Sequence, residues 1–130
     1  MMLDIKFYSK NGVSPVTIEL SSEFYQKLTK SDFSEIGTSR KQKINIEDGE
    51  ADDIEVVDLD KGKISNRTRL IDFFKEAIVE ESIAMLEKLG EGDTLPSKEE
   101  YKQQTYTLRK FQQILKVLEN SQYSYLQRVP

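Results

Sequence analysis

The stretch that decides the fold runs from Ser65 to Gly90 and reads SNRTRLIDFFKEAIVEESIAMLEKLG. Spacings of four and seven separate five of its large apolar residues, namely Leu70, Phe74, Ile78, Met85 and Leu89. Such spacings place side chains on one face of an α-helix, which buries that face against another element. The stretch therefore predicts a long amphipathic helix that begins at Ser65 or Asn66. Gly90 is the residue type that most often follows a helix end.

A second helix is predicted after a short loop. Residues 91–96 are rich in helix breakers, and a connection that short favours an antiparallel neighbour. Ser97 and Glu100 have the spacing of a capping box, in which each side chain satisfies a backbone N–H of the other residue. The helical spacing then continues to about Glu119 or Asn120, through Tyr101, Leu108, Phe111, Ile114, Leu115 and Leu118.

The N-terminal residues predict a β-hairpin. Residues 3–8 and 16–20 alternate apolar and polar side chains, which is the period of a strand with one face on a core. Asn11-Gly12 lies between them and supplies residues that tolerate a turn. Ser21 or Ser22 is placed to cap a short helix that follows the second strand.

A second hairpin is predicted further along, with weaker alternation. Phe33 and Ile36 indicate one more helical turn, and the polar residues 38–42 are expected to form a loop. Ile44 and Ile46 alternate with polar residues, as do Ile54 and Val56. The Asp48-Gly49-Glu50 segment lies where the turn between these strands would be.

Together these elements predict an α+β fold, in which a small antiparallel sheet of hairpins packs against a C-terminal antiparallel helical hairpin. We expect one domain over residues 1–130: hairpins and a short helix in 1–60, the helical hairpin in 65–120, and a packed tail in 121–130. The expected core joins helical to strand residues: Phe74, Ile78, Met85, Leu108, Phe111, Leu115, Ile5, Phe7, Ile18 and Leu20.

The composition excludes several kinds of chemistry. The 130 residues include no His and no Cys, and the formal net charge is −4. Without Cys there is no disulfide, thiolate nucleophile or cysteine–zinc site, and without His the commonest general base and metal ligand is missing. Because these residue types are missing, we expect a protein that is not an enzyme and has no cofactor. No export signal or long apolar run is visible, so we expect a cytoplasmic, bacterial protein.

The most distinctive feature is an acidic segment between residues 47 and 60 that contains no Lys or Arg. Its carboxylates form the candidate partner-binding site: Glu47, Asp48, Glu50, Asp52, Asp53, Glu55, Asp58 and Asp60. A concentrated negative field speeds the encounter with a basic partner. The alternative is a solvated hairpin edge whose charges only prevent unwanted strand pairing.

Metal binding by this segment is disfavoured. The calcium loop of an EF-hand needs oxygen ligands at positions 1, 3 and 5, Gly at 6 and Glu at 12. Counting from Asp48 puts Asp53 at position 6, and counting from Asp58 puts Lys63 there.

The acid-x-lysine spacing of Glu100 and Lys102 occurs in some nucleases, but Glu100 is better explained as a helix cap.

Nucleic-acid binding is disfavoured as well. Basic residues flank the acidic segment at 40–43 and 61–69, but the acids between them and the net negative charge oppose contact with phosphates. We expect these bases to neutralise the neighbouring acids and to stabilise the hairpin.

In size, acidity and layout, the chain resembles the small cytoplasmic immunity proteins of bacterial polymorphic-toxin and contact-dependent growth inhibition systems. The resemblance lies in the opening hairpin, residues 3–8 and 16–20, the acidic middle and the terminal helical pair. It implies a non-enzymatic inhibitor that neutralises a cognate toxin, basic and often a nuclease, by masking its active site. No family motif is present, so no individual residue role is carried over.

A structural or phage-type accessory protein that acts by homo-oligomerisation explains the same sequence. In that case the helical hairpin would be the assembly face. A monomeric protein would favour the inhibitor.

Overall fold

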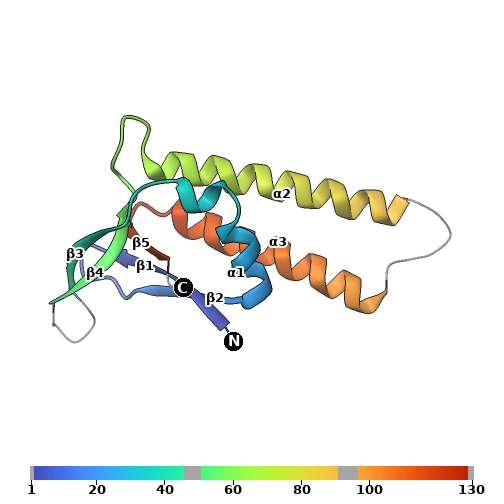
Figure 1. Ribbon diagram of the computed structural model, residues 1–130, viewed down its shortest axis with the longest axis horizontal. Helices are drawn as coiled ribbons and strands as arrows, with labels where there is room; N and C mark the ends of the chain where they lie inside the picture. Colours follow the sequence, from blue (N-terminus) through green and yellow to red (C-terminus); the bar gives the residue numbers. More distant parts are fainter. Residues whose placement is uncertain (1, 46–50, 91–96, 129–130) are drawn as a thin grey trace.

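The computed structural model describes residues 2–45, 51–90 and 97–128, and it confirms the predicted α+β class (Figure 1). An antiparallel sheet packs against a helical hairpin. The elements follow one another as β1 (Met2–Ser9), β2 (Val16–Ser21), α1 (Ser22–Thr29), a 3₁₀ turn (Asp32–Glu35), β3 (Arg40–Asn45), β4 (Ala51–Asp58), α2 (Asn66–Gly90), α3 (Lys98–Leu118) and β5 (Tyr123–Arg128).

The five strands form one sheet in the order β2-β1-β5-β4-β3, and each neighbouring pair is antiparallel. β5 therefore lies in the middle of the sheet, between β1 and β4. Residues 121–130 were expected to be a tail that packs on the body, and in the structure residues 123–128 of that tail also form a strand. Residues 123–126 are all buried, and a strand covered on both faces lacks the alternation that would mark it in a sequence.

The predicted hairpins and helix caps are present, with one boundary corrected. β3 begins at Arg40, so the expected loop over 38–42 ends earlier, and the expected turn at residues 48–50 lies outside the described residues. The hydroxyl of Ser21 accepts from the N–H of Phe24 at 3.3 Å. The hydroxyl of Ser97 accepts from the N–H of Glu100 at 3.2 Å, which is one of the two hydrogen bonds of the predicted capping box.

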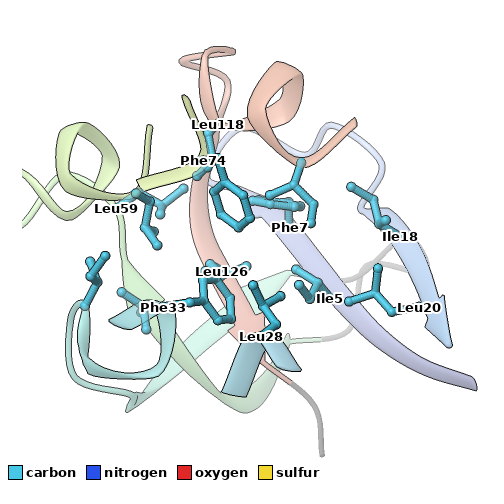
Figure 2. Packing of buried hydrophobic residues seen from close by; sticks show 14 of the residues in the cluster. Ile5, Phe7, Ile18, Leu20, Leu28, Phe33, Leu59, Phe74, Leu118 and Leu126 are labelled. Atoms are coloured by element: carbon cyan, nitrogen blue, oxygen red, sulfur yellow. The ribbon is translucent and has the colours of Figure 1, made fainter. Parts of the chain in front are cut away.

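The main core lies between one face of the sheet and the helices (Figure 2). All four strand residues expected there are buried. From the helices, the most buried side chains are Leu70, Phe74, Ile114 and Leu118, each at most 1% exposed. Aliphatic and aromatic groups that leave water in this way supply most of the driving force for folding.

The far ends of α2 and α3 extend beyond the sheet (Figure 1). Ile78, Met85 and Leu108, which were expected in the core, are consequently only half-buried. Phe111 and Leu115 are also half-buried, but both pack against the core. Helical periodicity selects a face of a helix, but it does not indicate where along the helix the sheet ends.

A small apolar cluster lies apart from the main core. It joins Tyr8 and Tyr125 from the centre of the sheet to Ile44 and Val56 of the β3–β4 hairpin. The Tyr8 hydroxyl donates to the Gln127 side-chain oxygen at 2.7 Å, and burial raises the pKa of this phenol. The cluster therefore holds the β3–β4 hairpin onto the rest of the sheet.

Arg128, at the end of β5, fastens the 3₁₀ turn to the sheet. Its guanidinium donates to the carbonyls of Phe33 at 2.6 Å, Ile36 at 3.2 Å and Gly37 at 3.3 Å, and it lies over the Phe33 ring. Burial lowers the pKa of Arg128, and the nearby Tyr25 opposes that shift. Because an arginine stays protonated in proteins, these charge-assisted bonds persist over the usual pH range.

Arg67, in the first turn of α2, connects three segments. Its guanidinium donates to the carbonyls of Leu118 at 2.7 Å and Asn120 at 3.2 Å, and to the carbonyl of Tyr123. It also pairs with the carboxylate of Asp60 at 3.3 Å. One side chain thus joins the start of α2, the end of α3 and the start of β5.

Replacing Arg67 with Lys is expected to destabilise the protein by about 2 kcal/mol, because an ammonium keeps the charge but cannot reproduce the planar fork of donors. The free energy of unfolding, measured by urea denaturation, tests this. Arg69→Lys is the matched control, since Arg69 is exposed two residues further along the same helix. Equal losses in the two variants would contradict a special role for Arg67.

Candidate functional site

The sequence-predicted site centres on the β3–β4 hairpin. Only Val57 and Asp58 of β4 pair with β5, so residues 51–56 are paired with β3 alone. The register places Lys43 opposite Asp53 and Lys41 opposite Glu55. Residues directly opposite one another lie on the same face of an antiparallel pair. Two of the cations that flank the acidic segment in the sequence, Lys41 and Lys43, therefore lie across the hairpin from two of its carboxylates.

Three carboxylates of β4, namely those of Asp52, Asp53 and Glu55, are exposed. Within the described part of the chain, no Lys or Arg nitrogen lies within ion-pair distance of them. Asp52 is opposite Ile44, so it has no cation across the hairpin. These three side chains are available to an incoming partner, and we call them the β4 carboxylates.

The other residues of the acidic segment are placed differently. The Asp58 carboxylate accepts from the backbone N–H of Asp60 at 3.0 Å, and Asp60 pairs with Arg67. Both side chains thus stabilise the turn that leads into α2. The remaining candidates, Glu47, Asp48 and Glu50, lie outside the described residues. Of the eight candidates, those that the structure describes as exposed and without an ion pair are the β4 carboxylates. Asp53 and Glu55 lie on the face of the hairpin that carries Lys43 and Lys41, whereas Asp52 lies on the other face, opposite Ile44.

A second feature was missed by sequence reasoning. A groove of about 470 Å³ lies where α1, α2 and α3 meet. The described residues that line it are aromatic and aliphatic side chains from all three helices, five carboxylates and one ammonium, that of Lys27. Its residues come from positions 21–32, 73–81 and 103–111. No short motif joins segments so far apart, so only the packing of the three helices reveals the groove.

In residues 2–45, 51–90 and 97–128, no group of three or more His, Cys, Asp or Glu side chains is arranged to hold a metal ion. The described helices include none that is both long and apolar enough to cross a membrane. Burial raises the pKa of the Tyr25 phenol, and Arg128 partly opposes this shift.

Comparisons with family models, curated proteins and solved structures found no match to this chain.

Proposed function

We propose that the protein is a non-enzymatic inhibitor of the immunity type, which binds a basic toxin through the β4 carboxylates. The observation that carries this proposal is their exposure without an ion-pair partner, on a hairpin that is anchored by a buried cluster. Because the backbone of a paired strand is already ordered, binding a partner needs to order only the side chains.

The charges around the hairpin define how such binding would work. Carboxylates on a solvated strand steer a basic partner during the encounter and add less to the final affinity. Lys41 and Lys43 weaken the field of Asp53 and Glu55 from across the hairpin. Asp52 is therefore expected to contribute most to steering. The association rate should therefore be high at low salt and should fall as added salt screens the charges.

The test is to neutralise the β4 carboxylates together, by Asp52→Asn, Asp53→Asn and Glu55→Gln. Neutral residues are preferred to lysines, which would repel Lys41 and Lys43 across the strands. The probe is the product of the gene directly upstream, which polymorphic-toxin systems place beside the immunity gene. Association at low salt is expected to slow about tenfold, and protection of growth on co-expression should weaken.

The matched control neutralises three exposed carboxylates elsewhere, by Glu19→Gln, Glu87→Gln and Glu119→Gln. It makes the same change in net charge and should leave the association rate close to that of the unaltered chain. If both triple variants slow association equally, only net charge matters. If neither does, the β4 carboxylates are not the interface.

A specific observation also favours the alternative, a structural or accessory protein that forms homo-oligomers. Val79, Ile83 and Leu86 lie on one face of α2, and they are 55%, 50% and 67% exposed. An apolar stripe of this kind is typical of an assembly face. Light scattering separates the two functions: a monomer supports the inhibitor, whereas an oligomer that Ile83→Glu dissociates supports the alternative.

A further inference from the structure

The groove at the junction of α1, α2 and α3 has an apolar floor. Phe24 and Leu28 come from α1, Phe73 from α2, and Tyr106 and Phe111 from α3. Phe73, Tyr106 and Phe111 are each only half-buried, so part of every ring faces the groove. Half-exposed aromatic rings at the bottom of a concave surface are the usual anchor points for apolar side chains of a ligand.

The floor is rigid. The Phe24 ring lies 5.3 Å from that of Phe111 and 6.0 Å from that of Tyr106, with the second pair edge to face. The Tyr106 hydroxyl accepts from the backbone N–H of Ser21 at 2.9 Å, which fixes the ring against the start of α1. A floor held in place by its own contacts needs no rearrangement before it binds a ligand.

The rim is acidic. Five carboxylates line the groove, one from α1, one from the 3₁₀ turn and three from α2: Glu23, Asp32, Glu76, Glu80 and Glu81. Among the described residues that line the rim, Lys27 supplies the one ammonium, and the ammonium of Lys110 lies over the nearby Tyr106 ring. No described Lys or Arg nitrogen lies within ion-pair distance of these carboxylates. An apolar floor between unpaired carboxylates matches a ligand that is apolar on one side and cationic on its flanks.

We propose that this groove binds a basic amphipathic α-helix of a partner protein. The groove follows α2 from Phe73 to Glu81 and α3 from Gln103 to Phe111, which is roughly 12 Å along each helix. That length accommodates about two turns, and so anchor side chains at positions i, i+3 or i+4, and i+7. Lys and Arg side chains that flank those anchors would reach the carboxylates of the rim.

This docking site is separate from the β4 carboxylates and does not depend on the inhibitor function. None of the β4 carboxylates lines the groove. The protein therefore presents two acidic surfaces of different kinds. The β4 carboxylates lie on a solvated strand suited to steering, whereas the groove has an apolar floor that can retain an anchor.

The test uses a fluorescent synthetic peptide of Leu and Lys, about four turns long and arranged as an amphipathic helix. Fluorescence anisotropy with the full chain is expected to show saturable binding that weakens with salt. Two comparison peptides are a shuffled sequence of the same composition and a helix in which Glu replaces Lys. Equal binding of either one would overturn the proposal.

Variants of the chain locate the bound peptide. Glu76→Lys with Glu80→Lys reverses two exposed rim charges, and Glu87→Lys with Glu99→Lys makes the same change away from the groove. Ala77→Phe fills part of the groove without changing its charge. The rim pair and Ala77→Phe should each weaken peptide binding about tenfold, because they remove attraction and space respectively.

The remaining outcomes are decisive. If the control pair weakens binding as much as the rim pair, the peptide senses only net charge and the proposal fails. It also fails if Ala77→Phe, shown to be folded by circular dichroism, binds normally, or if the chain forms a dimer that the rim pair dissociates. The neutralised β4 triple variant should bind the peptide normally, so failure of one proposal is distinguishable from failure of the other.

Discussion

A chain that ends at Gln122, and so lacks β5, is expected not to fold. β5 pairs with β1 on one side and with β4 on the other. Its removal therefore leaves the β1–β2 and β3–β4 hairpins without a strand that joins them into one sheet. It also removes the buried side chains of Tyr123, Tyr125 and Leu126. Each buried side chain of this size contributes about 1.5–3 kcal/mol, and a domain has only about 5–15 kcal/mol of stability in total.

Circular dichroism and limited proteolysis of the shortened chain measure this effect. A full-length matched pair gives an independent test: Leu126→Asp puts a charge at a position that is 1% exposed, whereas Gln122→Asp puts the same charge at an exposed position just before the strand. The first should unfold the protein and the second should not. A folded, protease-resistant chain ending at Gln122 would show that β5 is dispensable.

The location of β5 could not be predicted from its sequence. The segment YSYLQR contains two aromatic residues close together, which correctly indicates that it packs on the body. It lacks the alternation that identifies the other strands, because helices cover one face and the Tyr8 cluster covers the other. Strand order is decided by long-range pairing, for which a single sequence has no local signal.

The helices could be predicted well, because periodicity and caps are local properties. Ser97 caps α3 as expected, and α2 begins at Asn66. The positions buried along each helix were less predictable. Ile114 and Leu118 are more deeply buried than the expected Leu108 and Phe111, because they lie at the end of α3 nearer the sheet.

The candidate site could also be predicted only in part from the sequence. The acidic run was evident from the sequence, but only the register shows that Asp52 lacks a cation opposite it, whereas Asp53 faces Lys43. Only the turn into α2 shows that Asp60 is used by Arg67. The groove depends on three helices meeting, so its aromatic residues could be assigned to helix faces but not to one another.

Replacing Phe74 with Ala is expected to cost about 3–5 kcal/mol of stability, since truncating a fully buried ring loses transfer energy and leaves a cavity. Phe74 is 0% exposed, and its ring lies 5.1 Å from Phe73, 5.6 Å from Phe33 and 5.9 Å from Phe111. The cavity would be bordered by three rings that are themselves fixed by other contacts. Little relaxation is available to fill it, so the loss should fall toward the upper part of that range.

The control substitutions for Phe74→Ala are Asp52→Asn and Asp53→Asn. The free energy of unfolding of all three variants is measured by urea denaturation. Both carboxylates are exposed, so each substitution should change the free energy of unfolding by less than about 0.5 kcal/mol. A loss at either aspartate as large as that at Phe74 would mean that the carboxylate is needed inside the fold. A side chain that the fold requires in this way is not free to meet a partner, and the proposed role of the β4 carboxylates would then fail before any toxin is tested.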